Sequence, residues 1–598
     1  MADDQTPATP APAGRGPSSE QHRPPDGRGA DESRGLPDGL AGGGRAEGAA
    51  AGGNEPPAAA EEGEFIGHAR TVSILTLLSR VTGLLRDAVL AAVLGMTAIA
   101  DAFFIGFLVP NLFRRLFGEG ALTSAFIPHY AEALKEDRAL ARRLASLCLA
   151  ALAVALAGLT LVGEAVLAAM LMWGQWAEET ALAIRLVMLM LPYMPLICLV
   201  ALIGGVLHVH GRFGPPAAAP MLLNLTLMAG AAVAAWTGGS EPMGRQGVTI
   251  LAMSVLAAGV VQLIWQLMVL RRIEPLTTDF HGAWQYLRRI AMMMLPMLLG
   301  LAIFQFNAFF DSLLAFALAP RGERDTLWLF GREVACPVEP GAVAALQWAQ
   351  RLYQFPLGVF GIAVATAIFP ALSRAATAGG DDDGPAGGDF AGILRRGLRL
   401  TVFIALPASV GLLLVGLPLA RLIFERGQFE LADSIRVATI LAGYASAVWA
   451  YSMMHVLTRA YHALKDAQTP LRVGLVMVAM NVALNLVLIW PLGAAGLAWS
   501  TAITATVQVV VLAILLRRQV LRPVDAEVVT AWLRSAALCA LMAAIVVPPL
   551  VYFEPAGLMR SQSALLLGAM VLIGATVYLL GARLWGLAEL RWMMRRST

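Results

Sequence analysis

The sequence has few charged residues and few cysteines for its length of 598 residues. Only 14% of its residues are Asp, Glu, Lys or Arg, whereas a soluble globular protein carries about 25%. Its four cysteines show no paired spacing and three lie inside apolar runs, which supports neither a disulfide framework nor a metal site. Hydrophobic residues make up 58% of the chain and the mean hydropathy is +0.67. The apolar runs of about 20 residues suit the ~30 Å core of a bilayer. A soluble enzyme, a fibrous protein and a wholly disordered chain are therefore excluded.

The common catalytic motifs are also missing. The chain has no G-x-S-x-G, H-E-x-x-H or G-x-x-x-x-G-K-[ST] pattern. His208 and His210 flank a predicted loop and have no Cys or His partners in the sequence. We therefore expect a membrane transporter rather than an enzyme, with no organic cofactor and no nucleic-acid partner.

Residues 1–65 lack large apolar side chains almost entirely before Phe65 and consist mainly of Ala, Gly, Pro and charged residues. Such a segment buries too little surface to offset its ordering entropy, so a disordered N-terminal cytoplasmic tail is predicted. It has no charged start followed by an apolar core, so it is not a signal peptide. It is either a regulatory tail or an extension without an essential role.

Apolar stretches recur from about Arg70 to the end of the chain, and their lengths match transmembrane α-helices. We predict an all-α polytopic membrane protein with about fourteen spans. The approximate spans are 71–95, 101–118, 143–170, 180–206, 216–236, 248–270, 290–319, 343–371, 397–420, 435–458, 471–490, 494–516, 530–552 and 562–584.

The distribution of Lys and Arg predicts the orientation of these spans. Loops that follow even-numbered spans hold 19 Lys or Arg residues, and loops that follow odd-numbered spans hold 8. Positive residues are retained in the cytoplasm, so both termini are predicted to be cytoplasmic. The loop at about 320–341 then faces outward.

Ionisable residues within the spans are the candidate functional residues, because a buried Arg costs about 2.5–3.5 kcal/mol on insertion scales. The first span carries Ser79, Arg80, Arg86 and Asp87, with seven residues, or nearly two turns, between Arg80 and Asp87. These side chains should face a polar cavity, although Arg86 and Asp87 could instead lie at the interface and extend to the headgroups.

The second span begins with Asp101 and ends with Arg114 and Arg115, and Glu119 follows one turn after Arg115. This cluster is either part of the same cavity or a basic cap at a helix end.

The eighth span carries Gln347, Gln350, Arg351 and Gln354, and three of these form one polar stripe. Guanidinium groups suit bidentate binding of phosphate oxygens. Several arginines converging on one cavity therefore indicate an anionic substrate, with a phosphate or diphosphate favoured over a carboxylate.

Two further pairs of oxygen-bearing residues lie one turn apart within spans, Asn307 with Asp311 and Asn481 with Asn485. Oxygen ligands at this spacing could hold a hard cation such as Na⁺. The competing interpretation is hydrogen bonding between packed helices, although the membrane carboxylate of Asp311 needs a partner in either case.

Long, ungapped segments of the sequence resemble a known family. SRVTGLLRD is followed by ADAFFIGFLVPNLFRRLFGEGALTSAFIPHY and later by RLYQFPLGVFGIAVATAIFPALSR, and ERGQFELADS and HALKDAQTP fit the same pattern. Together with fourteen spans, these segments resemble the MurJ (MviN) family of lipid II flippases in the MOP exporter superfamily. The resemblance covers about residues 66 to 590.

The resemblance implies two pseudo-symmetric bundles, at 66–285 and 286–520, followed by C-terminal spans at 521–598 that form a groove for a lipid tail. It implies transport of lipid II, the undecaprenyl-diphosphate-linked peptidoglycan precursor, across the bacterial inner membrane by alternating access. The cavity arginines of the family fall on Arg80, Arg86, Arg114 and Arg351, with Ser79, Asp87, Asp101 and Glu119 in support.

Two features depart from the family pattern. Many members carry Asp and Glu where this chain has Gln350 and Gln354, which makes the cavity more positive, and the 320–341 loop is longer than usual. Some members bind Na⁺ at positions that correspond here to Asp311, Asn481, Asn485, Leu497 and Thr501, with an Asp in place of Asn485. The coupling source is therefore either Na⁺ or the membrane potential.

Besides lipid II, the expected partners are membrane lipids and proteins of cell-wall synthesis or division. Two alternative functions remain. One is another MOP exporter, for an O-antigen lipid or a drug, and the other is a non-transporting scaffold for cell-wall synthesis.

Overall fold

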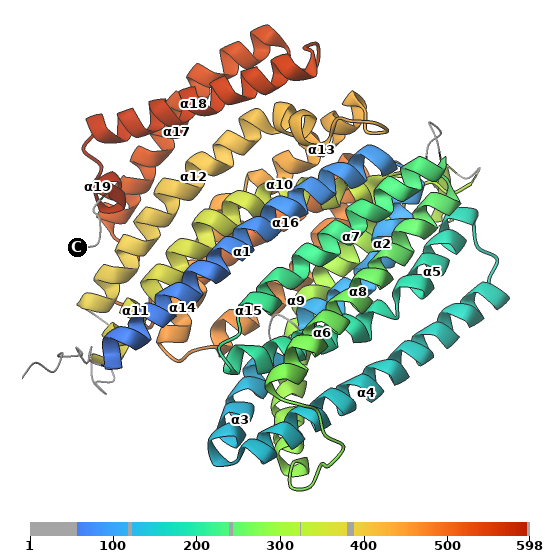
Figure 1. The fold of residues 1–598 in the computed structure, drawn as a ribbon. Helices are drawn as coiled ribbons and strands as arrows, with labels where there is room; N and C mark the ends of the chain where they lie inside the picture. The colour runs from blue at the N-terminus through green and yellow to red at the C-terminus, as the bar shows by residue number, and fades with distance from the viewer. Residues whose placement is uncertain are drawn as a thin grey trace, which may run out of the picture. The chain divides into compact units, whose positions relative to one another are not determined.

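The computed structural model describes residues 57–117, 122–238, 243–322, 325–329, 331–378 and 388–594. The chain divides into two units, Met1–Glu61 and Glu62–Thr598, and the second is the helical body shown in Figure 1. Most of the segment predicted to be a disordered tail lies outside the described residues. The division of the body at 285 and 520 stays a prediction.

Helices form nearly all of the described chain. Their bounds are α1 Pro57–Leu94, α2 Ala98–Leu116, α3 Leu122–Glu136, α4 Arg138–Trp173, α5 Glu178–Met190, α6 Tyr193–Val209, α7 Gly214–Gly238, α8 Arg245–Ile273, α9 Trp284–Ala317, α10 Ala342–Pro356, the π-helical turn η2 Leu357–Gly361, α11 Ile362–Ala378, α12 Asp389–Phe424, α13 Leu431–Ala445, α14 Val448–Ala463, α15 Gln468–Leu492, α16 Ala494–Leu516, α17 Ala526–Phe553, α18 Arg560–Leu584 and α19 Ala588–Met594.

Each of the fourteen predicted spans coincides with a helix or with two consecutive helices, which confirms the all-α fold class. The described residues contain eleven segments that are long and apolar enough to cross a membrane. The three predicted spans that fall short are those covered by α1, α2 and α10–α11. α1, α2 and α10 carry the arginines that the sequence analysis singled out, which are Arg80, Arg86, Arg114, Arg115 and Arg351. In addition, α10 and α11 are short, with 15 and 17 residues, because the turn η2 separates them.

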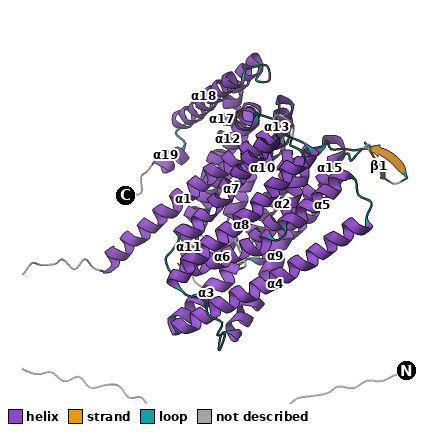
Figure 2. Ribbon diagram, turned by 45° about the vertical axis from the view of Figure 1, so that its right-hand side comes forward, coloured by secondary structure: helices purple, strands orange, loops and turns teal. Residues whose placement is uncertain are grey.

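Two loops contain structure that the sequence analysis did not predict. The segment after α2 forms the separate helix α3, which packs against α4 and α6. The loop at about 320–341, which is predicted to face outward, contains an antiparallel hairpin of β1 (Thr326–Leu329) and β2 (Arg332–Ala335), in which Trp328 pairs with Glu333. Figure 2 shows this hairpin standing apart from the helices.

The apolar side chains pack into three cores whose positions differ along the helices. The largest core joins α1–α8, called here the N-terminal half, to later helices of the C-terminal half, which begins with α9. Leu90 and Phe103 lie in the same cluster as Trp348 and Phe424. A second core lies within α11, α12, α14, α15 and α16, and a third joins α12 to α17 and α18. The residues that join the halves lie near Asp101, at the predicted outer end. The two halves are therefore packed tightly together at that end.

Close backbone contacts reinforce the outer end. Gly95, Gly341 and Gly427 all have positive φ values, of 56°, 82° and 56°. A Cβ on Gly95 would lie 2.7 Å from the carbonyl oxygen of Gln428, so a side chain at this position would collide with the opposite half. The N–H of Gln428 donates to the carbonyl of Ala92 over 2.8 Å. Glycine is required here both for backbone conformation and for close approach.

Exposed aromatic side chains lie near the helix ends. Trp173, Trp236 and Tyr552 are near the ends of α4, α7 and α17 that the topology places outside, and Trp284 and Trp585 are at the predicted inner ends of α9 and α18. Tryptophan and tyrosine concentrate at membrane–water interfaces. Their positions therefore agree with the expected span limits.

Candidate functional site

A large cavity of about 1630 Å³ lies between the two halves. Its walls come from α1, α2, α6, α7, α8, α10, α12, α17 and α18. At one end it is lined by His208, Phe213 and Met593, which the predicted topology places on the cytoplasmic side. The cavity therefore extends toward the predicted inner end, whereas the tight packing lies at the predicted outer end.

An ion-pair group that joins the two halves lies in this cavity. Arg86 and Asp87 are buried in α1, and Arg86 Nη2 lies 2.6 Å from Asp87 Oδ1. Arg351 of α10 reaches the other oxygen of Asp87, with 3.0 Å between Nε and Oδ2. One carboxylate therefore holds two guanidinium groups, and the group keeps a net positive charge.

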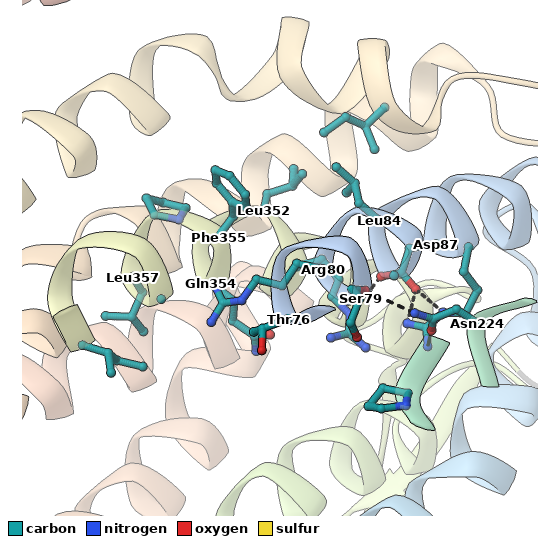
Figure 3. A pocket seen from close by; sticks show the side chains of 18 of the residues that line it. Thr76, Ser79, Arg80, Leu84, Asp87, Asn224, Leu352, Gln354, Phe355 and Leu357 are labelled. Atoms are coloured by element: carbon teal, nitrogen blue, oxygen red, sulfur yellow. Dashed lines mark hydrogen bonds and ion pairs between the residues drawn. The ribbon is translucent and has the colours of Figure 1, made fainter. Parts of the chain in front are cut away.

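Asn224 of α7 fixes the orientation of Arg86. Its Oδ1 accepts a hydrogen bond from Arg86 Nη1 over 3.0 Å, and its Nδ2 donates to the carbonyl of Ser79 and to Thr82 Oγ1. Figure 3 shows Ser79, Asp87 and Asn224 together on one wall. Asn224 is 4% exposed, so Arg86 is held by two neighbours before any substrate arrives.

The remaining predicted polar residues lie on both sides of this group. Arg114 lines the main cavity and donates from Nε to Asn111 Oδ1 over 3.0 Å, and Arg115 donates to Gln305 of α9 over 3.3 Å. Beside the main cavity is a chamber of about 40 Å³. Its polar lining residues are Arg86, Asp87, Asn111, Arg115, Gln347, Gln350, Arg351 and Gln354.

Arg80 has a different environment from the other arginines. Among the described residues no hydrogen bond or ion pair holds its guanidinium group, which lies against the backbone of Gly358 in η2. Figure 3 shows Arg80 extending from α1 toward Gln354 and Leu357. π-Helical turns occur frequently at functional sites, and here the turn and the missing side chain of Gly358 create the space for Arg80.

Replacing Gly358 by Ala is expected to displace Arg80 and to weaken anion binding, while the protein stays folded. A Cβ at Gly358 would overlap the end of the Arg80 side chain, which is flexible and can move away at little cost. The matched control is Gly411→Ala, because Gly411 lines the same cavity and its Cβ would meet nothing within 4 Å. Binding of a lipid diphosphate by the two purified variants checks this, and equal affinities would contradict it.

The cavity continues into an apolar groove between α12, α17 and α18. Val415, Met542, Val546 and Met570 are among the residues that line it. Tyr578 also lines this region, but its hydroxyl donates to the carbonyl of Phe403 over 2.8 Å. The groove therefore offers aliphatic surface, while the arginines lie in the adjoining part of the same cavity.

Two predicted residues are placed elsewhere or lie outside the described residues. Asp101 lines neither cavity and instead caps the start of α10, because its carboxylate accepts the N–H groups of Gly341 and Ala344 over 2.8 and 2.9 Å. An acidic side chain at a helix N-terminus is stabilising. Glu119 falls in the undescribed segment between α2 and α3.

The predicted cation-binding residues come together in a buried cluster of α9, α15 and α16. Asn485 Nδ2 donates to Asp311 Oδ1 over 2.5 Å and to Asn481 Oδ1 over 3.0 Å. Asn481 Nδ2 lies 3.4 Å from Thr501 Oγ1. In the described residues no group of three or more His, Cys, Asp or Glu side chains could hold a metal. The oxygens fit a hard cation only if the Asn485 amide nitrogen turns away.

Sequence reasoning missed three buried polar residues on the cavity wall, Asn224, Gln262 and Gln266. Each is an amide side chain in a largely apolar span, and Gln262 and Gln266 lie one turn apart in the same span. That pattern is a detectable signal, because polar groups within the membrane usually face a cavity or another helix.

The fold is that of the MOP-type transporters. One solved structure with this fold, "Lipid II flippase MurJ, inward closed conformation", superimposes with a TM-score of 0.65 over 88% of this chain and 99% of that one, at 22% sequence identity. An inward-facing multidrug resistance MATE family transporter of the MOP superfamily superimposes with a TM-score of 0.56 over 74% of this chain and 97% of its own, at 16% identity.

The chain belongs to the MurJ family. The family model described as "Lipid II flippase MurJ" matches residues 90–567. The probable lipid II flippase MurJ of Vibrio cholerae is 32% identical over 450 residues, which cover 73% of this chain and 79% of that protein. The chain is thus a multi-pass inner-membrane transporter rather than an enzyme, and the family resemblance predicted from the sequence is confirmed.

Proposed function

We propose that this protein moves lipid II from the cytoplasmic to the periplasmic leaflet by alternating access, with the diphosphate bound by the cavity arginines. The observation that carries the proposal is the Arg86–Asp87–Arg351 group, which joins the two halves beside an aliphatic groove. A lipid diphosphate has the same combination of a compact anion and a long hydrocarbon chain.

Charge distribution in the cavity supports an anionic substrate. The described residues that line the cavity include four arginines but a single carboxylate, that of Asp87. The arginines are Arg80, Arg86, Arg114 and Arg351. A diphosphate can form bidentate charge-assisted hydrogen bonds with such forks. A site for cationic drugs would need the opposite excess of charge, so this observation disfavours the drug-exporter alternative.

The transport step proposed here uses the two ends of the molecule in turn. The diphosphate enters from the inner end and replaces Asp87 as the partner of Arg351, while the prenyl chain follows the groove of α12, α17 and α18. Opening of the outer end then requires separation of Asp101 from the N-terminus of α10 and of Ala92 from Gln428. The apolar contacts between Leu90, Phe103, Trp348 and Phe424 at this end must separate as well.

Coupling forms a second part of the proposal. The oxygen cluster of Asp311, Asn481, Asn485 and Thr501 is a candidate Na⁺ site, and the inside-negative membrane potential would act on a positively charged cavity as it reorients. Transport measured in vesicles with either an imposed Na⁺ gradient or an imposed potential distinguishes the two sources.

Depletion of the protein in its host is expected to stop peptidoglycan synthesis and to cause lipid II to accumulate in the inner leaflet. The measurement is the amount of lipid II in each leaflet. Complementation with Arg80→Ala separates a flippase from a scaffold, because a scaffold would still support growth with this variant. An unchanged lipid II level after depletion would rule out the proposed function.

A further inference from the structure

A polar strip on the N-terminal half of the cavity has no assigned role. Tyr193 of α6 and Gln262 and Gln266 of α8 line the cavity wall, and each side chain is at most 1% exposed. The Tyr193 hydroxyl and the Oε1 atoms of both glutamines have no hydrogen-bond partner among the described residues. A buried polar atom without a partner is costly, so three such atoms on one cavity wall need an explanation.

Gln262 and Gln266 lie on one face of α8, and Tyr193 of α6 packs against the same face. Gly259, Gln262 and Gln266 are spaced i, i+3 and i+7 on α8, which places them on one side of the helix. The ring of Tyr193 lies on Gly259, since a Cβ there would be 2.6 Å from it. Gln262 Nε2 donates to the carbonyl of Ala219 in α7 over 2.6 Å, which anchors this glutamine in the wall.

This strip leads from the arginine group toward the predicted inner end. Asn224, which holds Arg86, lies on α7 about one turn beyond Ala219, the partner of Gln262. In the other direction the wall continues past Gln266 to His208, at the mouth of the cavity. The strip therefore begins beside the proposed diphosphate position.

The opposite wall has a different chemistry. The parts of α12, α17 and α18 that line the cavity present aliphatic and aromatic side chains, and the one hydroxyl among them, that of Tyr578, is already bonded. A molecule whose phosphate lies at the arginines thus meets hydrocarbon on one side and neutral hydrogen-bonding groups on the other. The aliphatic wall suits a hydrocarbon chain, and the wall with Tyr193, Gln262 and Gln266 suits a neutral polar group of the same ligand.

We propose that Tyr193, Gln262 and Gln266 form a subsite for the neutral hydroxyl and amide groups in the sugar and peptide part of the transported headgroup. This rests on the proposed function and deepens it. The unpaired oxygens are covered in the unliganded structure, so the glutamine side chains turn toward the cavity when hydroxyl or amide N–H groups of the ligand arrive. The unpaired Oε1 atoms of the two glutamines are acceptors, so they pair with hydroxyl or amide N–H groups of a ligand and not with phosphate oxygens.

The test compares two lipids that share a tail and a diphosphate. Purified full-length protein is titrated with lipid II and, separately, with undecaprenyl diphosphate, which has no sugar or peptide. Gln266→Met keeps the length of the side chain and removes its amide, and Tyr193→Phe removes only the hydroxyl. Each variant is expected to bind lipid II about tenfold more weakly, the effect of one lost hydrogen bond, and to bind undecaprenyl diphosphate as the wild type does.

Two controls separate the possible failures. Ser254→Ala lies on α8 outside the cavity lining, where Ser254 donates to the Leu251 carbonyl, and it should change neither affinity. Arg351→Ala should weaken both lipids, and if it weakens neither, the proposed function fails. Suppose that Arg351→Ala weakens the binding of both lipids. If Gln266→Met and Tyr193→Phe then leave the binding of both lipids unchanged, or weaken the binding of both lipids equally, the subsite proposal alone is overturned.

Discussion

Arg351→Ala is expected to reduce transport of lipid II by about 10- to 100-fold. Hydrogen bonds to charged groups contribute about 1.5–3 kcal/mol each, and every 1.4 kcal/mol is a factor of ten in affinity. The variant also removes the link between α10 and Asp87 of α1, whose atoms are 3.0 Å apart. The measurement is the rate at which lipid II reaches the outer leaflet of reconstituted vesicles.

Two companion variants show whether the effect comes from the guanidinium fork. Arg351→Lys keeps the charge but loses the planar pair of donors, so it should restore only part of the rate. Arg472→Ala removes an arginine from the exposed start of α15, where its partner is Gln468, and should leave transport unchanged. Wild-type transport by Arg351→Ala would exclude a role of this residue in anion binding.

Gly427→Ala is expected to hold the outer end open and to lower transport strongly, with the fold retained. A Cβ on Gly427 would overlap the carbonyl of Ala92 in the opposite half, and φ at Gly427 is +56°. Spectroscopic labels on Thr97 and Glu339, in a background without the four natural cysteines, report the separation of the two halves at this end. The label distance should shift from short to long.

The control for Gly427→Ala separates the effect of backbone strain from the effect of a steric collision with the opposite half. Gly211 has φ of +70°, but a Cβ there would meet nothing within 4 Å. Gly211→Ala should therefore cost about 1 kcal/mol in backbone conformation and leave the label distance unchanged. A short label distance in Gly427→Ala would show that the contact with Ala92 does not control closure.

Span positions could be predicted because hydrophobic length is a local property of the sequence. The same is true of Arg86, Asp87 and Arg351, since charges inside apolar spans stand out without any knowledge of the fold. The ion-pair partners of Asp87 could not be predicted. Spacing along α1 places Arg80 and Asp87 on one face of the helix but names no ion-pair partner, and the structure joins Asp87 to Arg86 and to Arg351. Contacts across 264 positions of sequence are set by tertiary packing.

Asp101 and Gly358 show a second limit of sequence reasoning. The acidic residue at the start of α2 was expected in the cavity, but its carboxylate caps α10, because the start of α10 packs against α2 in the folded body. The importance of Gly358 depends on a π-helical turn and on the conformation of Arg80. Neither can be derived from residue spacing.

The adjacent Arg86 and Asp87 have a consequence for biogenesis. Asp87 is made 264 residues before Arg351, an interval of about 13–50 s at synthesis rates of roughly 5–20 residues per second. During this time α1 must enter the bilayer without its later partner. Because Asp87 lies 2.6 Å from Arg86 in the same helix, we expect the charge of Arg86 to be compensated during insertion, before Arg351 is made. Asp87→Asn is therefore expected to impair membrane integration of α1 as well as transport by the finished carrier.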